Sequence, residues 1–142
     1  MIFLFIGLPL LVAAVLPLIG KISKKFLPDL LANAVFLFLF ILAITSGRQL
    51  ISQGPVLKQL DWFGETLNVQ VAVDGFGLFM LMAISLVTLC VGLFSIDYMD
   101  HYGSKANYYA LLLMMMVGMN GLVLVTDLFG VYLFLEVAAI AS

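Results

Sequence analysis

A single carboxyl group, Glu136, lies in the middle of the apolar stretch LFGVYLFLEVAAIAS at residues 128–142. Apolar surroundings disfavour the ionised form of such a group, because it loses its hydration there. The group is stabilised when a cation pairs with it or when it takes up a proton. A buried carboxyl that alternates between these two states can pick up and release protons. The chemistry that this residue suggests is therefore proton handling.

The sequence offers Glu136 no cation within an apolar segment. All six Lys and Arg residues lie in predicted loops or at the ends of predicted helices, and the one histidine, His101, lies in a predicted loop. Two explanations stay open: desolvation keeps Glu136 protonated, or its cationic partner belongs to residues outside this chain. A third interpretation is structural, in which a neutral Glu136 donates a hydrogen bond to another helix.

Three other polar residues could lie on an ion pathway or support Glu136. Tyr132 precedes it by one helical turn on the same face, so its hydroxyl could bond the carboxylate, although packing is the commoner role. Asp127, in VTDLF, is expected to cap the helix that follows by accepting hydrogen bonds from free backbone N–H groups; ion entry is the alternative. Asn120 is expected to form a hydrogen bond between helices rather than to bind an ion.

Further polar residues lie in the predicted third helix and in the loop after it. The hydroxyls of Ser85, Thr88 and Ser95 are expected to bond the backbone one turn back. Asp97, with Asp100 and His101, could be imagined as a metal cluster, but these residues are expected to be solvated in the loop.

The sulfur-containing residues indicate no cofactor. Four methionines at residues 114–119 are accompanied by no Cys or His that would complete a copper site. The lone Cys90 excludes an internal disulfide and a thiolate metal cage. The sequence also has no nucleophile paired with a base, no phosphate-binding glycine loop and no haem-type ligand pair. We therefore expect no cofactor, no metal and no covalent catalysis in this chain.

The composition is that of a membrane protein. The hydrophobic class makes up 65% of the 142 residues and charged residues make up 10%, against about 25% charged in an ordinary soluble domain. The apolar residues form blocks of about 20, the length that crosses a hydrocarbon core of about 30 Å as a helix. The net charge of −2 is small and scattered, which excludes a nucleic-acid partner. The expected fold is an all-α integral membrane protein in contact with the lipid bilayer.

The apolar blocks predict one domain, or part of one, with five transmembrane helices of which the last is incomplete. Lys21, Lys24 and Lys25 follow the first block rather than precede it, so we interpret that block as a retained span and not as a signal peptide. Short cytoplasmic loops are rich in Lys and Arg, so these lysines and Lys105 predict an outside N-terminus. The spans are expected at about residues 2–19, 27–46, 76–96, 109–125 and 128–142, with a long outer loop at 47–74.

The outer loop contains LNVQVAVD at residues 67–74, in which apolar and polar or small residues alternate. A period of two predicts a short strand or extended segment. Such a segment could cover the ends of the helices, or it could be a docking edge for another subunit.

Two long stretches resemble a known family. They are VDGFGLFMLMAISLVTLCVGLFSIDYM, at residues 73–99, and ANYYALLLMMMVGMNGLVLVTDLFGVYLFLEVAAIAS, at residues 106–142. Together they resemble the N-terminal part of the antiporter-like subunits shared by respiratory complex I, Mrp-type sodium/proton antiporters and energy-converting membrane hydrogenases. Glu136, on the helix after TDLF, falls on the family's key glutamate. Many complex I members have Trp before that Glu and Pro after it, whereas Leu135 and the AAIAS segment are more similar to the Mrp and hydrogenase branch.

The resemblance carries expectations about the rest of the machinery. Members of the family have about fourteen helices in two inverted repeats, each with a broken helix and a lysine near the membrane centre. Their first-half glutamate pairs with a lysine two helices later, and charge movement along this line is thought to drive proton or sodium transfer. The resemblance thus implies that the lysine partner of Glu136 lies beyond Ser142, in the same polypeptide or in another chain.

The resulting hypothesis is that the chain is the N-terminal part of an ion-translocating antiporter-like subunit, in which Glu136 is the charge-switching acid. Its partners would be the other membrane subunits of a redox-driven or Mrp-type complex, in an energy-coupling membrane such as the cell inner or plasma membrane. The alternative is a structural subunit that moves no ions and packs against a complete antiporter-like neighbour through small residues such as Ala138 and Ala139. The missing cation disfavours a free-standing transporter.

Overall fold

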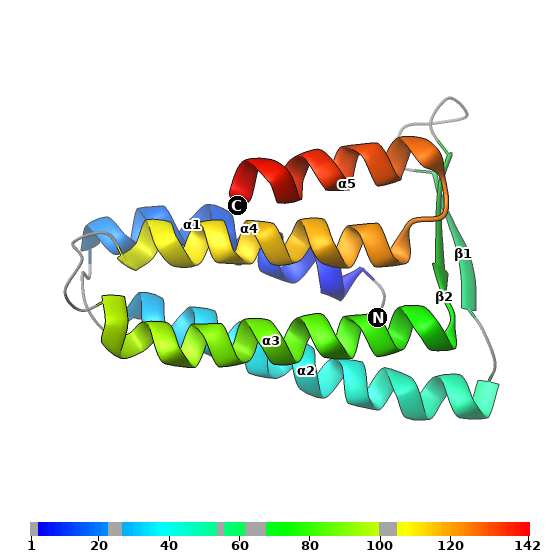
Figure 1. Cartoon of the computed structure of the whole chain (residues 1–142), viewed down its shortest axis with the longest axis horizontal. Coiled ribbons are helices and arrows are strands. Elements are labelled where there is room, and N and C mark those ends of the chain that lie inside the picture. Colours follow the sequence, from blue (N-terminus) through cyan, green and yellow to red (C-terminus); the bar gives the residue numbers. More distant parts are fainter. Residues whose placement is uncertain (1–2, 23–26, 54–55, 62–67, 100–104) are drawn as a thin grey trace.

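The computed structural model describes residues 3–22, 27–53, 56–61, 68–99 and 105–142. Within these ranges the chain forms a helical bundle with one β-hairpin at its end (Figure 1). The elements in chain order are α1 (Leu4–Ile22), α2 (Leu27–Gln53), β1 (Val56–Asp61), β2 (Asn68–Val73), α3 (Gly75–Tyr98), α4 (Lys105–Leu124) and α5 (Leu128–Ala141). The predicted helical membrane fold is confirmed, with five helices in the described ranges; the number of membrane spans and the orientation stay predictions.

Consecutive helices run in opposite directions, so their connections gather at the two ends of the bundle (Figure 1). The end of α1, the start of α2, the end of α3 and the start of α4 lie at one end. The hairpin and the α4–α5 connection lie at the other. Helix α4 is central, because α1 and α5 both pack against it, while α2 packs mainly against α3.

The core is built from the apolar side chains of α1 to α4. Leu16, Phe36, Leu81 and Met116 contribute one fully buried side chain from each of these helices in turn. The fifth helix differs, since Gly130 is its one buried residue in the described structure. α5 therefore rests on the bundle by one face and leaves the opposite face uncovered.

The apolar runs give helices of membrane-spanning character. α3, α4 and the Leu27–Arg48 part of α2 are each long and apolar enough to cross a membrane, whereas Leu4–Gly20 and α5 are shorter apolar helices. A helix suits this environment because it satisfies its own backbone hydrogen bonds without water.

Two helix boundaries depart from the prediction by more than one helical turn. α2 continues past Arg48 to Gln53, so the long loop starts later than residue 47, and α4 begins at Lys105 rather than at Tyr109. An apolar run marks the part of a helix that lies in hydrocarbon, but backbone hydrogen bonding continues through polar residues as well. Lys105 thereby belongs to a helix and not to the loop in which the sequence had placed it.

The alternating segment in the long loop is strand β2, as its period predicts. It pairs antiparallel with β1, with Val56 opposite Val73 and Asp61 opposite Asn68. The residues of β1, VLKQLD, do not alternate, so the sequence did not predict the partner strand. Asp74 follows β2 directly and caps α3, because its Oδ1 accepts a hydrogen bond from the Gly77 N–H at 2.6 Å.

Candidate functional site

The start of α5 is fixed by Asp127. Its side-chain Oδ2 accepts a hydrogen bond from the backbone N–H of Gly130 at 2.9 Å, and its extended backbone places it directly before the helix. A carboxylate at this position satisfies a free donor and interacts favourably with the helix dipole. The predicted capping role of Asp127 is confirmed.

Small residues set the distance between α4 and α5. A Cβ added to Gly118 would lie 2.7 Å from the backbone nitrogen of Ala138 and 2.8 Å from its Cα, and a Cβ on Gly121 would meet the ring of Phe134. The two helices are therefore in backbone-level contact. Ala138 packs within this chain, while Ala139 is exposed.

Glu136 lies on the uncovered face of α5. It makes no hydrogen bond or ion pair with the described residues, and Tyr132 one turn earlier has 63% of its surface exposed. No hydrogen bond joins the two side chains in the described structure. Large apolar side chains surround them on the same helix, and the exposed ones are Leu128, Phe129, Leu133, Leu135 and Ile140. This arrangement presents a carboxyl and a hydroxyl within an otherwise apolar surface.

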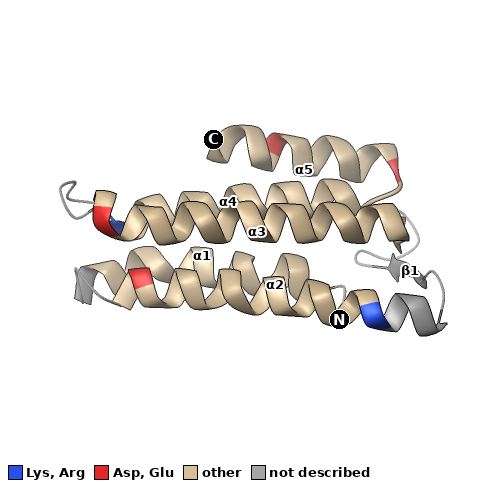
Figure 2. Ribbon diagram, turned by 60° about the horizontal axis from the view of Figure 1, so that its bottom comes forward, with Lys and Arg blue, Asp and Glu red and all other residues tan. Residues whose placement is uncertain are grey.

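Charged residues are sparse elsewhere on the helices. Figure 2 shows Lys, Arg, Asp and Glu mainly toward the helix ends, with one acidic position well inside α5. No group of three His, Cys, Asp or Glu side chains that could hold a metal ion occurs in the described ranges. Asp97 is exposed at the end of α3, and Asp100 and His101 lie outside the described residues.

Asn120 forms the interhelical hydrogen bond that the sequence predicts, and the structure gives the reason. Its Nδ2 donates to the backbone carbonyl of Phe5 at 3.0 Å, and the residue is completely buried. Proline has no N–H, so Pro9 cannot donate to that carbonyl four residues earlier in α1. Asn120 thus supplies from α4 the donor that α1 lacks.

The buried hydroxyls of α3 behave as predicted. Ser85 donates to the carbonyl of Leu81, Thr88 to that of Ile84, and Ser95 to that of Val91, at 2.6, 2.8 and 2.7 Å. Each is a bond to the backbone one turn back.

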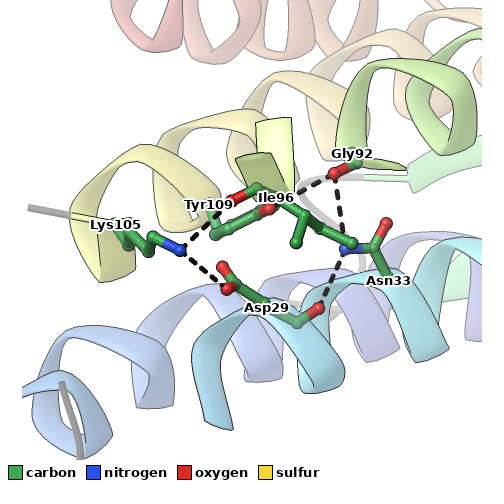
Figure 3. A network of polar contacts seen from close by, with 6 residues as sticks. All are labelled: Asp29, Asn33, Gly92, Ile96, Lys105 and Tyr109. Carbon is green, nitrogen blue, oxygen red and sulfur yellow. Dashed lines mark hydrogen bonds and ion pairs between the residues drawn. The ribbon is translucent and has the colours of Figure 1, made fainter. Parts of the chain in front are cut away.

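A second charged site, which the sequence did not predict, lies where α2 and α4 begin. The Nζ of Lys105 on α4 lies 3.0 Å from Oδ2 of Asp29 on α2, and the two side chains are 7% and 9% exposed. The same Nζ donates to the carbonyl of Ile96, near the end of α3, at 3.2 Å (Figure 3). The pair thereby ties three helices together.

Neutral hydrogen bonds extend this charged site along α3. The amide of Asn33 donates to the carbonyl of Asp29 at 2.9 Å and to that of Gly92 at 3.4 Å, and the hydroxyl of Tyr109 donates to Gly92 at 3.2 Å (Figure 3). One signal in the sequence pointed here: Asp29 and Asn33, four residues apart, are the polar residues of the otherwise apolar run LPDLLANAVF.

Comparison with known proteins identifies the architecture. Residues 62–109 match the family described as NADH-Ubiquinone oxidoreductase (complex I), chain 5 N-terminus. Na(+)/H(+) antiporter subunit A1 of Staphylococcus aureus is 31% identical over 138 residues, which cover 95% of this chain and 17% of that protein. The chain is a homologue of the antiporter-like membrane subunits. It corresponds to the N-terminal part of such a subunit, and it spans about a sixth of the length of the curated relatives that it matches.

Solved structures agree that the chain has the fold of an antiporter-like subunit. The structure of the Mrp complex from Dietzia sp. DQ12-45-1b contains a chain with a TM-score of 0.83 and 26% identity, over 99% of this chain and 26% of that one. An archaeal respiratory membrane complex, the membrane-bound sulfane sulfur reductase, contains one with a TM-score of 0.87 and 22% identity, over 99% and 28%. The second likeness shows the fold alone. This antiporter-like chain is thus an integral membrane protein of the kind found in multi-subunit complexes.

Proposed function

We propose that the antiporter-like chain takes part in moving protons or sodium ions across a membrane, and that Glu136 is the acid that changes charge during the cycle. The observation that carries the proposal is the setting of Glu136. It is an exposed carboxyl in the middle of an apolar helix whose outer face no described residue covers.

The depth of Glu136 supports this role. It follows Leu128, the first residue of α5, by eight positions, and a rise of about 1.5 Å per residue puts it about 12 Å along the helix. Asp127 caps the helix at its start, at the end of the bundle that carries the hairpin. A charged side chain near a membrane centre costs about 3 kcal/mol on insertion scales and therefore faces a protein interior with a partner.

The uncovered face of α5 is where that partner would pack. Lys105, a buried cation of α4, already pairs with Asp29. We therefore propose that a lysine outside this chain faces Glu136, on another helix of the same subunit or of a neighbouring one. Tyr132, one turn away on the same face, would lie beside this pair. The host would be a redox-driven or Mrp-type complex in an energy-coupling membrane.

The test is Glu136→Gln in the native complex, with proton and sodium fluxes measured in membrane vesicles. We expect coupled transport to fall to background with normal assembly, because glutamine keeps the shape but cannot change charge. Asp97→Asn, which neutralises an exposed acid at the end of α3, is the matched control and should transport normally. Parental transport in Glu136→Gln would refute the role.

The rival structural function is best tested at Ala139. Ala138 contacts Gly118 within this chain, so Ala138→Leu would disturb the chain itself under either hypothesis. Ala139 is exposed, so Ala139→Leu perturbs a neighbouring helix without disturbing the contact with α4. Lost assembly in Ala139→Leu, together with unchanged transport in Glu136→Gln, would favour the structural role.

A further inference from the structure

The buried pair of Asp29 and Lys105 has a structural explanation that accounts for part of its geometry. Asp29 lies in the first turn of α2, where the helix dipole favours a negative charge. Lys105 donates to Ile96, one of the last carbonyls of α3, where a positive charge is favoured. Each charge therefore suits the helix end that it approaches.

Two features of Asp29 are not explained by helix ends. Only Oδ2 binds Lys105, and the buried Oδ1 accepts no hydrogen bond from the described residues. A stability role alone would not require charge here, because a buried ion pair is often no more stable than apolar residues of similar volume. The free oxygen is a position at which a proton can add without breaking a bond.

Burial also links the two charges to each other. If Lys105 left while Asp29 stayed ionised, an uncompensated carboxylate would remain in a site with less than a tenth of either side chain exposed, which is strongly unfavourable. Separation of the pair therefore requires another positive charge on Asp29. The smallest such charge is a proton.

The other titratable groups near Asp29 do not take the place of Lys105 as its partner. Tyr109 of α4 interacts with Asp29 both electrostatically and through its side-chain hydroxyl, and that hydroxyl donates to the carbonyl of Gly92 in this structure. The hydroxyl of Tyr108 is paired with Ser95. Asp97 of α3 is exposed. Among the described residues, Lys105 is the cation that holds Asp29.

We infer that Asp29 is a second proton-exchange site of the chain, with Lys105 as its tethered counter-ion in the state seen here. A proton from water at this end of the bundle adds to Oδ1 of Asp29, and Lys105 moves away from the neutral carboxyl. When Lys105 returns, the proton leaves to water and the ion pair re-forms. The hydrogen bond from Lys105 Nζ to the Ile96 carbonyl is released and re-formed together with the ion pair, and the O–H bond on Asp29 is the one covalent bond made and broken.

The position of the pair connects this exchange to Glu136. Lys105 is the first residue of α4, and the same continuous helix carries Gly118, on which Ala138 of α5 rests. A movement of Lys105 thus acts on the helix that supports α5. The expected effect on transport rests on the proposed function, whereas proton binding at Asp29 does not.

The experiment uses the native complex and three variants. Asp29→Asn/Lys105→Met removes both charges together and so leaves no unpaired buried ion, Glu136→Gln removes the other acid, and Asp97→Asn is a control. Infrared difference spectra between acid and alkaline buffer report the C=O stretch of protonated carboxyl groups. We expect one component of this band to be missing in the double variant and present in Glu136→Gln, and transport in the double variant to fall by about tenfold or more.

The outcomes separate the two hypotheses. A double variant with the parental infrared band, or with parental transport while Glu136→Gln is inactive, overturns the role of Asp29 and leaves the proposed function standing. Parental transport in Glu136→Gln, with the Asp29 band component absent from the double variant, refutes the proposed function instead.

A conservative variant covers the case in which the neutral pair does not assemble. Lys105→Arg keeps the positive charge, and a guanidinium can hold the carboxylate with two hydrogen bonds and release it less readily. Assembly with slower transport is then expected. Assembly with parental transport would overturn the inference.

Discussion

The contact between α4 and α5 predicts that Gly118→Ala destabilises the protein, although alanine is the better helix former. Helix propensity alone would raise the free energy of unfolding by up to about 1 kcal/mol. The new methyl group, however, would lie 2.7 Å from the nitrogen of Ala138 and 2.8 Å from its Cα, whereas non-bonded carbon atoms prefer about 3.5–4.0 Å. α5 would have to withdraw by about 1 Å, and such overpacking costs about 1–3 kcal/mol.

The matched control is Gly7→Ala. A Cβ at Gly7, in α1, has no neighbouring atom within 4 Å, so this variant reports the helix propensity without the contact. The free energy of unfolding should therefore be lower in Gly118→Ala than in Gly7→Ala by about 1–3 kcal/mol. A difference of 2 kcal/mol is roughly a thirtyfold change in the unfolding equilibrium.

The assay is unfolding of the purified protein in mixed micelles with increasing sodium dodecyl sulfate, followed by circular dichroism. Adding Ala138→Gly to Gly118→Ala should restore only part of the loss, because the backbone nitrogen and Cα of residue 138 remain too close. Equal stability of Gly118→Ala and Gly7→Ala would refute the reasoning and show that α5 is not seated on Gly118.

Two further predictions concern single hydrogen bonds. Asn120→Leu should cost about 1–3 kcal/mol of stability, because the buried Phe5 carbonyl loses its donor. Adding Pro9→Ala to Asn120→Leu should recover much of that loss by restoring the N–H of residue 9. If Asn120→Leu cost the same stability with proline and with alanine at residue 9, the explanation would be contradicted. Asp127→Ala should cost about 0.5–2 kcal/mol by removing the cap of α5, whereas Asp127→Asn, which keeps a side-chain oxygen, should cost less; both are measured in the same unfolding assay.

Features that depend on neighbouring residues could be predicted from the sequence. The apolar blocks predict the helices because hydrocarbon leaves a chain little alternative to a helix. The caps at Asp74 and Asp127 and the back-bonded hydroxyls of α3 are also local, since each partner is three or four residues away. The sequence could predict that Asn120 forms a hydrogen bond between helices. It could not predict the partner, which is a carbonyl left without a donor by Pro9.

The features that escaped prediction depend on distant residues. Asp29 and Lys105 are 76 positions apart; Asp29 is visible as an isolated acid, but nothing in the sequence near either residue indicates its partner. Only the fold brings them together, because the start of α2 and the start of α4 lie at the same end of the bundle. Strand β1 escaped for a related reason: its pairing with β2 specifies it, while its own residues do not alternate.

The central claim, that Glu136 works by changing its charge, is tested most directly by comparing Glu136→Gln with Glu136→Asp. Aspartate keeps a carboxyl group one methylene shorter, and glutamine keeps the length without the charge. Coupled ion flux should persist at a reduced rate in vesicles of assembled complex with aspartate and fall to background with glutamine. Equal rates in the two variants, whether both parental or both at background, would contradict charge switching at this residue.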